Sequence, residues 1–298
     1  MGRFLFHLLI WFTASLLGCV YYNTFYNAQR FYRQAERIRK KAPADSLPQA
    51  AVELYDRAVE KAAKVVAFYP RSEWVDDALL LMGKAFYHQG KNRKAIRKFR
   101  ELLANYPESE LRGEALFWLG KSYAAAGDYH AAQEVFRRII RKGDSQWVEE
   151  STYRLAKLLF HRGDYQGVKA ECESLLHAFP EGRYAPRAHL LLGHCAYELG
   201  DYGEAETRFR EVLSRRPNRQ IRYEATLKLG ECLMAQGEYR KAAEVFQGLL
   251  ADEHYYPKFP VVKLKIATCK REAGDYEGAM AQYRSLAEEY PRTDFAAQ

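Results

Sequence analysis

A repeat of about 37 residues constrains this 298-residue chain more than any other feature of its sequence. A small residue recurs at one position of each repeat: Gly83, Gly120, Ala156, Gly193, Gly230 and Ala267. Subtracting successive positions gives steps of 37, 36, 37, 37 and 37 residues. A fixed period of this length is typical of chains built from stacked supersecondary units. We therefore expect similar units that share one continuous core.

Each unit has the pattern of two short amphipathic helices joined by a glycine turn. The turn glycines keep the same step: Gly90, Gly127, Gly163, Gly200, Gly237 and Gly274. In the second helix of most units a small residue is followed four residues later by a bulky one, as in Ala132 and Phe136. Small residues let two helices approach closely, and glycine ends a helix at low steric cost. Because one hairpin cannot bury its own apolar face, we predict stacked hairpins, with the bulky residue filling the gap to the next unit.

The segment Glu114–Ile140 contains L-G-x2-Y and then A-x3-F, and it resembles the tetratricopeptide repeat (TPR). Proline closes four of the six clear units: Pro107, Pro180, Pro217 and Pro291. The resemblance implies an all-α fold, namely a TPR α-solenoid of about seven helical hairpins in a right-handed superhelix. It covers most of the chain, and it is specific for fold and weak for function.

The first 19 residues have the features of a secretory signal. Arg3 precedes an apolar run that is shorter than the roughly 18–20 residues of a membrane-spanning helix. The ending Leu16-Leu17-Gly18-Cys19 resembles the lipobox of bacterial lipoproteins. The resemblance implies removal of residues 1–18, diacylglycerol on the Cys19 thiol and acylation of the new amino terminus, which together anchor a protein stably. The alternatives are an uncleaved membrane anchor, or an ordinary signal with a chance cysteine.

The residues after Cys19 bear on localisation. By analogy with Gram-negative lipoproteins, Val20-Tyr21 in place of an Asp favours sorting to the outer membrane, on its periplasmic side. Residues 19–71 are then expected to hold the lipidated amino terminus and a divergent first hairpin, because Pro70 lies 37 residues before Pro107. The aromatic cluster of Tyr21–Lys41 either packs onto the next repeat or contacts a partner or a membrane surface.

Residues 72–298 are expected to form a solenoid of six repeats. After Pro291 the sequence begins another lead-in, and no polar capping helix follows in the printed sequence, although solenoid ends normally need one. Two interpretations stay open. The exposed face of the last repeat meets a partner or another copy, or this end frays.

Composition narrows the classes of function. The net charge is +8, much of it in helical runs such as Lys91–Arg100, which are either solvated faces or sites of attraction to anionic lipid. Nucleic acid is not expected as a partner of an exported chain. Cys195, Cys232 and Cys269 occupy equivalent positions of successive repeats and are expected to be small buried residues. The cysteine spacing shows neither a disulfide framework nor a metal pair.

The motifs of common enzyme classes are absent from the sequence. It contains no H-E-x-x-H, no glycine-rich phosphate loop and no G-x-S-x-G. His88 and His161 share one repeat position and are expected to be surface groups, not metal ligands. We therefore expect no catalysis, no cofactor and no metal.

A peptide-binding groove is the candidate site. The TPR resemblance implies that positions 5, 9 and 12 of each repeat face a concave groove. The candidates are Leu80, Lys84, Tyr87, Phe117, Lys121, Tyr153, Lys157, Phe160, Leu190, His194 and Tyr197. Aromatic anchors beside lysines suit a peptide with apolar side chains and a carboxylate. Alternatively, the position-5 residues pack between repeats and the lysines are solvated. We expect charge reversal of Lys84, Lys121 and Lys157 to weaken partner binding while leaving thermal stability nearly unchanged.

A lipidated cysteine followed by TPR units with YPxS lead-ins resembles two groups of bacterial envelope proteins. One is the BamD group of β-barrel assembly lipoproteins, from which this chain departs by having about seven repeats instead of five. The other is the periplasmic TPR group associated with the Tol–Pal system, from which it departs by its lipobox and by lacking an evident N-terminal coiled coil. TPR lipoproteins of gliding and secretion machineries are a third possibility.

These resemblances imply a non-enzymatic, outer-membrane-anchored scaffold that binds protein partners in the periplasm, with outer-membrane protein assembly as the first candidate process. The alternatives are coordination of the envelope with Tol–Pal and peptidoglycan synthesis, a part in a gliding or secretion machinery, regulation of a cell-wall synthase, and a module that binds peptidoglycan or a small ligand.

Overall fold

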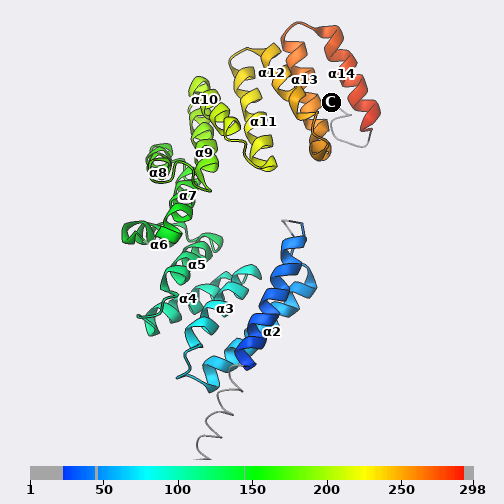
Figure 1. The fold of residues 1–298 in the computed structure, drawn as a ribbon. Coiled ribbons are helices and arrows are strands. Elements are labelled where there is room, and N and C mark those ends of the chain that lie inside the picture. The colour runs from blue at the N-terminus through cyan, green and yellow to red at the C-terminus, as the bar shows by residue number, and fades with distance from the viewer. Residues whose placement is uncertain (1–22, 44–45, 144, 292–298) are drawn as a thin grey trace, which may run out of the picture. The chain divides into compact units, whose positions relative to one another are not determined.

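The computed structural model describes residues 23–43, 46–143 and 145–291. Every regular element in these ranges is a helix, which confirms the all-α prediction. Most consecutive helices pack against each other as antiparallel pairs (Figure 1). The predicted signal segment and Cys19 lie outside the described residues.

The described helices pair in chain order into seven hairpins. The first consists of the N-terminal helix (residues 23–41) and α2. The other helices are α2 (Gln49–Phe68), α3 (Val75–His88), α4 (Asn92–Asn105), α5 (Arg112–Ala125), α6 (Tyr129–Lys142), α7 (Ser145–His161), α8 (Tyr165–Ala178), α9 (Ala185–Glu198), α10 (Tyr202–Ser214), α11 (Arg219–Ala235), α12 (Tyr239–Leu249), the 3₁₀ helix η1 (Glu253–Lys258), α13 (Phe259–Glu272) and α14 (Tyr276–Glu289).

The chain divides into two compact units within α7. Unit 1 spans Met1–Ser151 and unit 2 spans Thr152–Gln298. In unit 1, Phe25 and Phe31 of the N-terminal helix are buried with residues of α2, α3 and α4. Phe25 stacks on Trp74 with ring centroids 5.5 Å apart, so packing onto the next repeat accounts for this part of the aromatic cluster. Unit 2 has a corresponding core that includes Phe209 and Phe246.

Glycine and phenylalanine face each other inside four of the hairpins. A Cβ added at Gly120 would lie 2.7 Å from Cε1 of Phe136, and one added at Gly193 would lie 2.6 Å from Cε1 of Phe209. Gly83 with Phe99 and Gly230 with Phe246 repeat this arrangement. The small residues therefore have the predicted role of close approach. The aromatic ring packs on the glycine of its own hairpin, a contact that the repeat pattern alone does not predict.

The turns confirm the prediction that glycine ends the first helix of each hairpin. All six predicted turn glycines have positive φ, between 71° at Gly90 and 84° at Gly274, where glycine has no steric cost. The Asp that follows the glycine in several units caps the next helix: the Asp128 side chain accepts a hydrogen bond from the Ala131 N–H at 3.1 Å. Asp164, Asp201 and Asp275 do the same at α8, α10 and α14.

The cysteines behave as buried apolar residues. Cys172, Cys195, Cys232 and Cys269 are all free thiols and buried. Burial raises the pKa of Cys195 and of Cys232 to about 12. This agrees with the prediction of small buried residues, and in the described part of the chain no disulfide is present.

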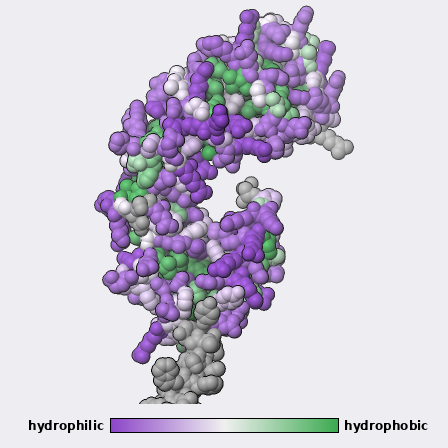
Figure 2. All heavy atoms as spheres, in the orientation of Figure 1, coloured by the Kyte–Doolittle hydropathy of each residue, from purple (hydrophilic) through white to green (hydrophobic). Residues whose placement is uncertain are grey.

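Polar and charged side chains cover most of the visible face of each unit, with apolar atoms showing between the helices (Figure 2). None of the helices in the described residues is long and apolar enough to cross a membrane.

Candidate functional site

The predicted groove residues lie on the first helices of their hairpins, and the structure places them in two groups. Unit 1 contains Leu80, Lys84, Tyr87, Phe117 and Lys121. Unit 2 contains Tyr153, Lys157, Phe160, Leu190, His194 and Tyr197. Binding at these residues stays a prediction.

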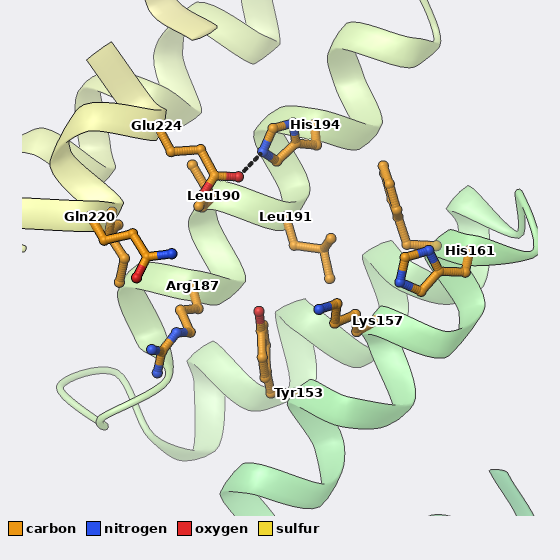
Figure 3. A pocket seen from close by; sticks show the side chains of 11 residues that line it. Tyr153, Lys157, His161, Arg187, Leu190, Leu191, His194, Gln220 and Glu224 are labelled. Carbon is orange, nitrogen blue, oxygen red and sulfur yellow. Dashed lines mark hydrogen bonds and ion pairs between the residues drawn. The ribbon is translucent and has the colours of Figure 1, made fainter. Parts of the chain in front are cut away.

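In unit 2 a pocket of about 390 Å³ opens between α7, α9 and α11 (Figure 3). Five predicted residues line it: Tyr153, Lys157, Phe160, Leu190 and His194. The others are His161, Arg187, Leu191, Gln220, Ile221 and Glu224. The repeat period causes this convergence, because equivalent positions of successive first helices lie side by side in stacked hairpins.

His194 is held by its neighbours at one edge of this pocket. Its Nε2 lies 3.1 Å from Oε1 of Glu224, across from α9 to α11 (Figure 3). Its ring also lies edge-on to Phe209, with centroids 5.6 Å apart. The hydrogen bond with His194 lowers the pKa of Glu224, although partial burial opposes the shift. The one carboxylate among the lining residues is therefore already engaged.

Two cations contribute to the same pocket. Lys157 is exposed on α7, and within the described residues no carboxylate lies at ion-pair distance from it. Arg187 is partly exposed on α9. Figure 3 shows the Lys157 and Tyr153 side chains extending from α7 toward the α9 side, where Leu190 and Leu191 lie. The arrangement can accept a carboxylate next to an apolar group.

Tyr197 does not line this pocket. Its ring packs edge-on against Tyr202, with centroids 5.4 Å apart, and the Lys228 ammonium lies 4.9 Å from its ring centroid. Lys228 in turn pairs with Glu231 at 2.8 Å. Tyr197 thus belongs to the packing between α9, α10 and α11.

The two predicted lysines of unit 1 are both engaged by nearby side chains, Lys84 by one of the next repeat and Lys121 by one of its own helix. The Lys84 Nζ lies 2.8 Å from Oε1 of Glu114, so α3 and α5 are joined by an ion pair. The Lys121 Nζ lies 3.6 Å from the centroid of the Trp118 ring, a cation–π contact. Tyr87 lies edge-on to Trp118, with centroids 5.2 Å apart. Charge reversal of Lys84 would therefore leave Glu114 facing a like charge, so the sequence-based expectation of unchanged stability does not fit this residue.

The other two unit 1 candidates have apolar surroundings. Phe117 is only 3% exposed and stacks on Trp147 with centroids 4.7 Å apart, so it is a core residue. Leu80 lines a small pocket of about 290 Å³ together with Lys84 and Tyr32. Phe117 thus follows the alternative in which position 5 packs between repeats.

The N-terminal helix supplies a polar cluster that sequence reasoning missed. Glu36 accepts two hydrogen bonds from Arg39, both of 2.9 Å, and another from the Tyr55 hydroxyl. His88 Nε2 lies 3.5 Å from the same carboxylate. Although burial opposes it, hydrogen bonding by Arg39 and Tyr55 lowers the pKa of Glu36 to about 2. The spacing of three residues between Glu36 and Arg39 predicts an ion pair along one helix. The sequence gives no sign that Tyr55 of α2 and His88 of α3 pack against this pair.

The prediction that His88 is a surface group is wrong. Only 10% of its side chain is exposed, because it lies between the rings of Tyr55, Tyr87 and Trp118. Burial lowers the pKa of His88 to about 4. His161, at the same position of a later repeat, is exposed as expected. The difference arises because the N-terminal hairpin covers the His88 side of α3.

In the ranges that the structure describes, no three or more His, Cys, Asp or Glu side chains gather where they could hold a metal ion. The chemistry of both groups is that of binding: apolar walls, aromatic faces and cations.

Three family models match the chain. Two are described as a tetratricopeptide repeat and match residues 80–147 and 233–298, and one is described as a tetratricopeptide repeat-like domain and matches residues 150–260. No curated protein matches the sequence.

Several solved structures have a similar fold. The C-terminal part of a TPR repeat-containing protein from Cytophaga hutchinsonii is 16% identical with a TM-score of 0.65, over 89% of this chain and 98% of that one. A tetratricopeptide repeat protein from Parabacteroides merdae is 14% identical with a TM-score of 0.56, over 88% and 93% of the two chains. PilW, described as a widely conserved type IV pilus biogenesis factor, is 19% identical with a TM-score of 0.55, over 75% and 97%. At these identities the similarity shows the fold alone.

Proposed function

Because this chain is a tetratricopeptide-repeat protein, we propose that it is a non-enzymatic scaffold that binds a protein partner in the pocket of α7, α9 and α11. The observation that carries the proposal is the convergence of Lys157, Phe160 and Leu190 from successive repeats on one pocket. The matching ligand is a peptide segment with an apolar side chain and a nearby carboxylate, because such a segment uses both the apolar floor and the cations.

The charges in this pocket support a carboxylate. Lys157 is exposed, and Arg187 lies across from it on the next repeat. Among the described residues of the lining, Glu224 is the only acidic one, and it is engaged by His194. An incoming carboxylate would therefore meet two cations without displacing an ion pair of the protein.

The proposal extends to the cell envelope through the sequence at Cys19. A lipid-anchored scaffold on the periplasmic side of the outer membrane, serving outer-membrane protein assembly, is the function we propose. It rests on the lipobox-like Leu16–Cys19 sequence and on the TPR units that follow. The structural similarity to PilW, a type IV pilus biogenesis factor, supports the fold of this chain and not its function.

The partner test is affinity capture of the mature protein from detergent-solubilised membranes, with identification by mass spectrometry. Lys157→Glu is compared with Lys169→Glu, which makes the same charge change at an exposed position of α8 outside the pocket. We expect one specific partner, a component of β-barrel assembly, to be lost with Lys157→Glu and retained with Lys169→Glu.

Two results would contradict the proposal. Equal partner sets for both variants would remove the pocket as the binding surface. Capture of Tol–Pal or cell-wall synthesis proteins without any barrel-assembly component would move the function to envelope coordination.

The anchor has its own test. In cells fed a palmitate analogue, the wild-type chain should incorporate the label and Cys19→Ala should not. An intact mass with residues 1–18 removed and an unmodified Cys19 thiol would refute the lipoprotein proposal. This outcome does not depend on the partner test.

A further inference from the structure

Unit 1 contains a strongly basic pocket that the proposed scaffold function does not use. Its volume is about 650 Å³, and it lies between the N-terminal helix, α3 and α5. Six cations line it: Arg33, Arg37, Arg39, Lys40, Lys84 and Lys121. The volume is within the range of roughly 300–1,000 Å³ of small-molecule sites.

Among the described residues that line this pocket, cations outnumber carboxylates. Glu36 is the one acidic residue among them, and it binds Arg39. Glu114 lies beside the pocket and pairs with Lys84. Six cations and these two carboxylates leave 6 − 2 = +4, against a net charge of +8 for the whole chain. Concentrating like charges in one cavity opposes folding, so an anion that enters it gains a large Coulombic attraction.

The cations lie on two sides of the pocket, so they can contact a ligand from both. Arg33, Arg37 and Lys40 follow one another at spacings of four and three residues, which puts them on one face of the N-terminal helix. Lys84 and Lys121 come from α3 and α5. Tyr32, Tyr87 and Trp118 form apolar walls between the two sets of cations. The site therefore combines two kinds of group. Planar guanidinium groups can each bind two oxygens of one phosphate, and the aromatic rings can pack against the apolar part of a small organic ligand.

We propose that this pocket binds a compact anion with two or three phosphate groups, held by Arg33 and Arg37 on one side and by Lys121 on the other. Each phosphate monoester carries about −1.5 to −2 charges, so two or three of them balance an excess of +4. An acidic peptide would need four carboxylate side chains in the same cavity. The phosphate groups can belong to a soluble phosphorylated compound or to the headgroup of a lipid.

The test uses the full chain, purified from membranes in a non-ionic detergent, and isothermal titration calorimetry at constant ionic strength. Pyrophosphate probes the soluble source. Cardiolipin, whose two phosphodiester groups carry about one negative charge each and so compensate about half of the excess, is titrated in mixed micelles against phosphatidylcholine and probes the lipid source. Saturable binding of pyrophosphate assigns a soluble ligand, and binding of cardiolipin alone assigns a headgroup.

A matched pair of double variants separates the pocket from general charge. Arg33→Gln with Arg37→Gln removes two pocket cations, four residues apart on an exposed helix face. Arg93→Gln with Arg97→Gln removes two cations of the same spacing from α4, outside the pocket lining. We expect the first pair to weaken binding about tenfold or more, since it removes charge-assisted hydrogen bonds, and the second by less than about twofold, since exposed distant charges are screened.

Three outcomes would overturn the proposal: no saturable binding of either probe, equal losses in the two double variants, or tighter binding of a hexaglutamate peptide than of pyrophosphate. None of these bears on the pocket of unit 2, so the partner proposal stands or falls separately.

Discussion

The glycine–phenylalanine contact shows how single residues set the distance between two helices. At Gly120 the ring of Phe136 occupies the place where any other residue would put its Cβ, 2.7 Å from the nearest ring carbon. The hairpin of α7 and α8 solves the same problem differently, with Ala156 on the first helix and Cys172 in the position of the ring, both fully buried. A larger residue on one helix is thus matched by a smaller one on the other.

This compensation predicts a non-additive pair of substitutions. Gly120→Ala should cost about 1–3 kcal/mol because the Phe136 ring must move, and Phe136→Cys should cost about 3–5 kcal/mol because it leaves a cavity. The double variant copies the Ala156 and Cys172 combination, so we expect it to be more stable than the sum of the two costs by about 0.5–3 kcal/mol. Urea denaturation followed by circular dichroism measures all three. Strict additivity would mean that the ring does not limit helix approach.

Two single residues, His88 and Glu36, make the stability of the fold depend on pH. The folded pKa of His88 is about 4, below the ordinary value of 6.5, because the ring is buried. The unfolded chain therefore binds more protons between pH 6.5 and 4, and stability falls as pH falls through that window. The folded pKa of Glu36 is about 2 against 4.5, so its contribution is complete above pH 4.5 and is lost as pH falls toward 2.

His88→Phe should flatten the upper of these two windows. The substitution keeps an aromatic ring among Tyr55, Tyr87 and Trp118 but removes the titrating group. We expect the wild-type chain to lose unfolding free energy on the order of a few kcal/mol between pH 6.5 and 4, and His88→Phe to lose clearly less. His161→Phe is the control, since it makes the same substitution at an exposed residue of the same repeat position. Urea midpoints at several pH values decide it, and equal slopes for all three proteins would contradict a buried neutral imidazole.

At the scale of the helix, the start of each second helix depends on the residue after the turn glycine. Asp128 accepts the Ala131 N–H at 3.1 Å and so satisfies one of the free N–H groups of α6. Glu238 occupies the same place before α12 but makes no capping hydrogen bond from its side chain. The Glu238 carboxylate instead lies 2.7 Å from Nζ of Lys241, in an exposed ion pair within the first turn of α12.

Removing the carboxylate at this position should therefore lower stability at α6 and have little effect at α12. Asp128→Ala should destabilise the protein by about 1 kcal/mol, within the range of about 0.5–2 kcal/mol measured for helix caps. Glu238→Ala removes a carboxylate at the equivalent position and should change stability by much less. Thermal unfolding of both variants provides the comparison. A loss for Glu238→Ala as large as that for Asp128→Ala would show that charge near the helix start, and not the hydrogen bond, is what stabilises these helices.

The helices and turns could be predicted from sequence because their signals are local and repeated. The glycine at each turn and the small residue in each first helix recur at one period, so the hairpins follow from spacing alone. The sites depend on which helix covers which face. Repeat position predicted a lysine groove, but Lys84 pairs with Glu114 of the neighbouring first helix, and Lys121 lies over the ring of Trp118, one turn earlier on its own helix. The burial of His88 depends on the divergent first hairpin, whose sequence departs from the repeat.

At the scale of the whole molecule, the charge is distributed unevenly between the candidate sites of the two units. The unit 1 pocket carries an excess of +4 over the carboxylates that contact it. The unit 2 pocket has two cations, Lys157 and Arg187, and one engaged carboxylate. A solenoid allows this because each repeat contacts mainly its neighbours, so separate surfaces can serve different ligands without sharing a core.

The same nearest-neighbour stacking predicts that unit 2 does not open all at once. Its four thiols are buried, and burial raises the pKa of Cys269 to about 11, so a thiol reagent reacts only after local opening. Cys269 lies on α13, which packs on α14, and α14 buries only Ala279 and Leu286 while Met280 is 54% exposed. Few buried apolar side chains mean a low free energy of local opening.

Single-cysteine variants in a Cys19→Ser background test this directly. We expect Cys269 to react with a maleimide about tenfold faster than Cys195 of α9 in native buffer, which corresponds to opening that is cheaper by about 1.4 kcal/mol. In concentrated urea the two rates should be equal, which controls for the intrinsic reactivity of the thiols. Equal rates in native buffer would mean that unit 2 opens cooperatively, and its repeats would then not act as separable elements.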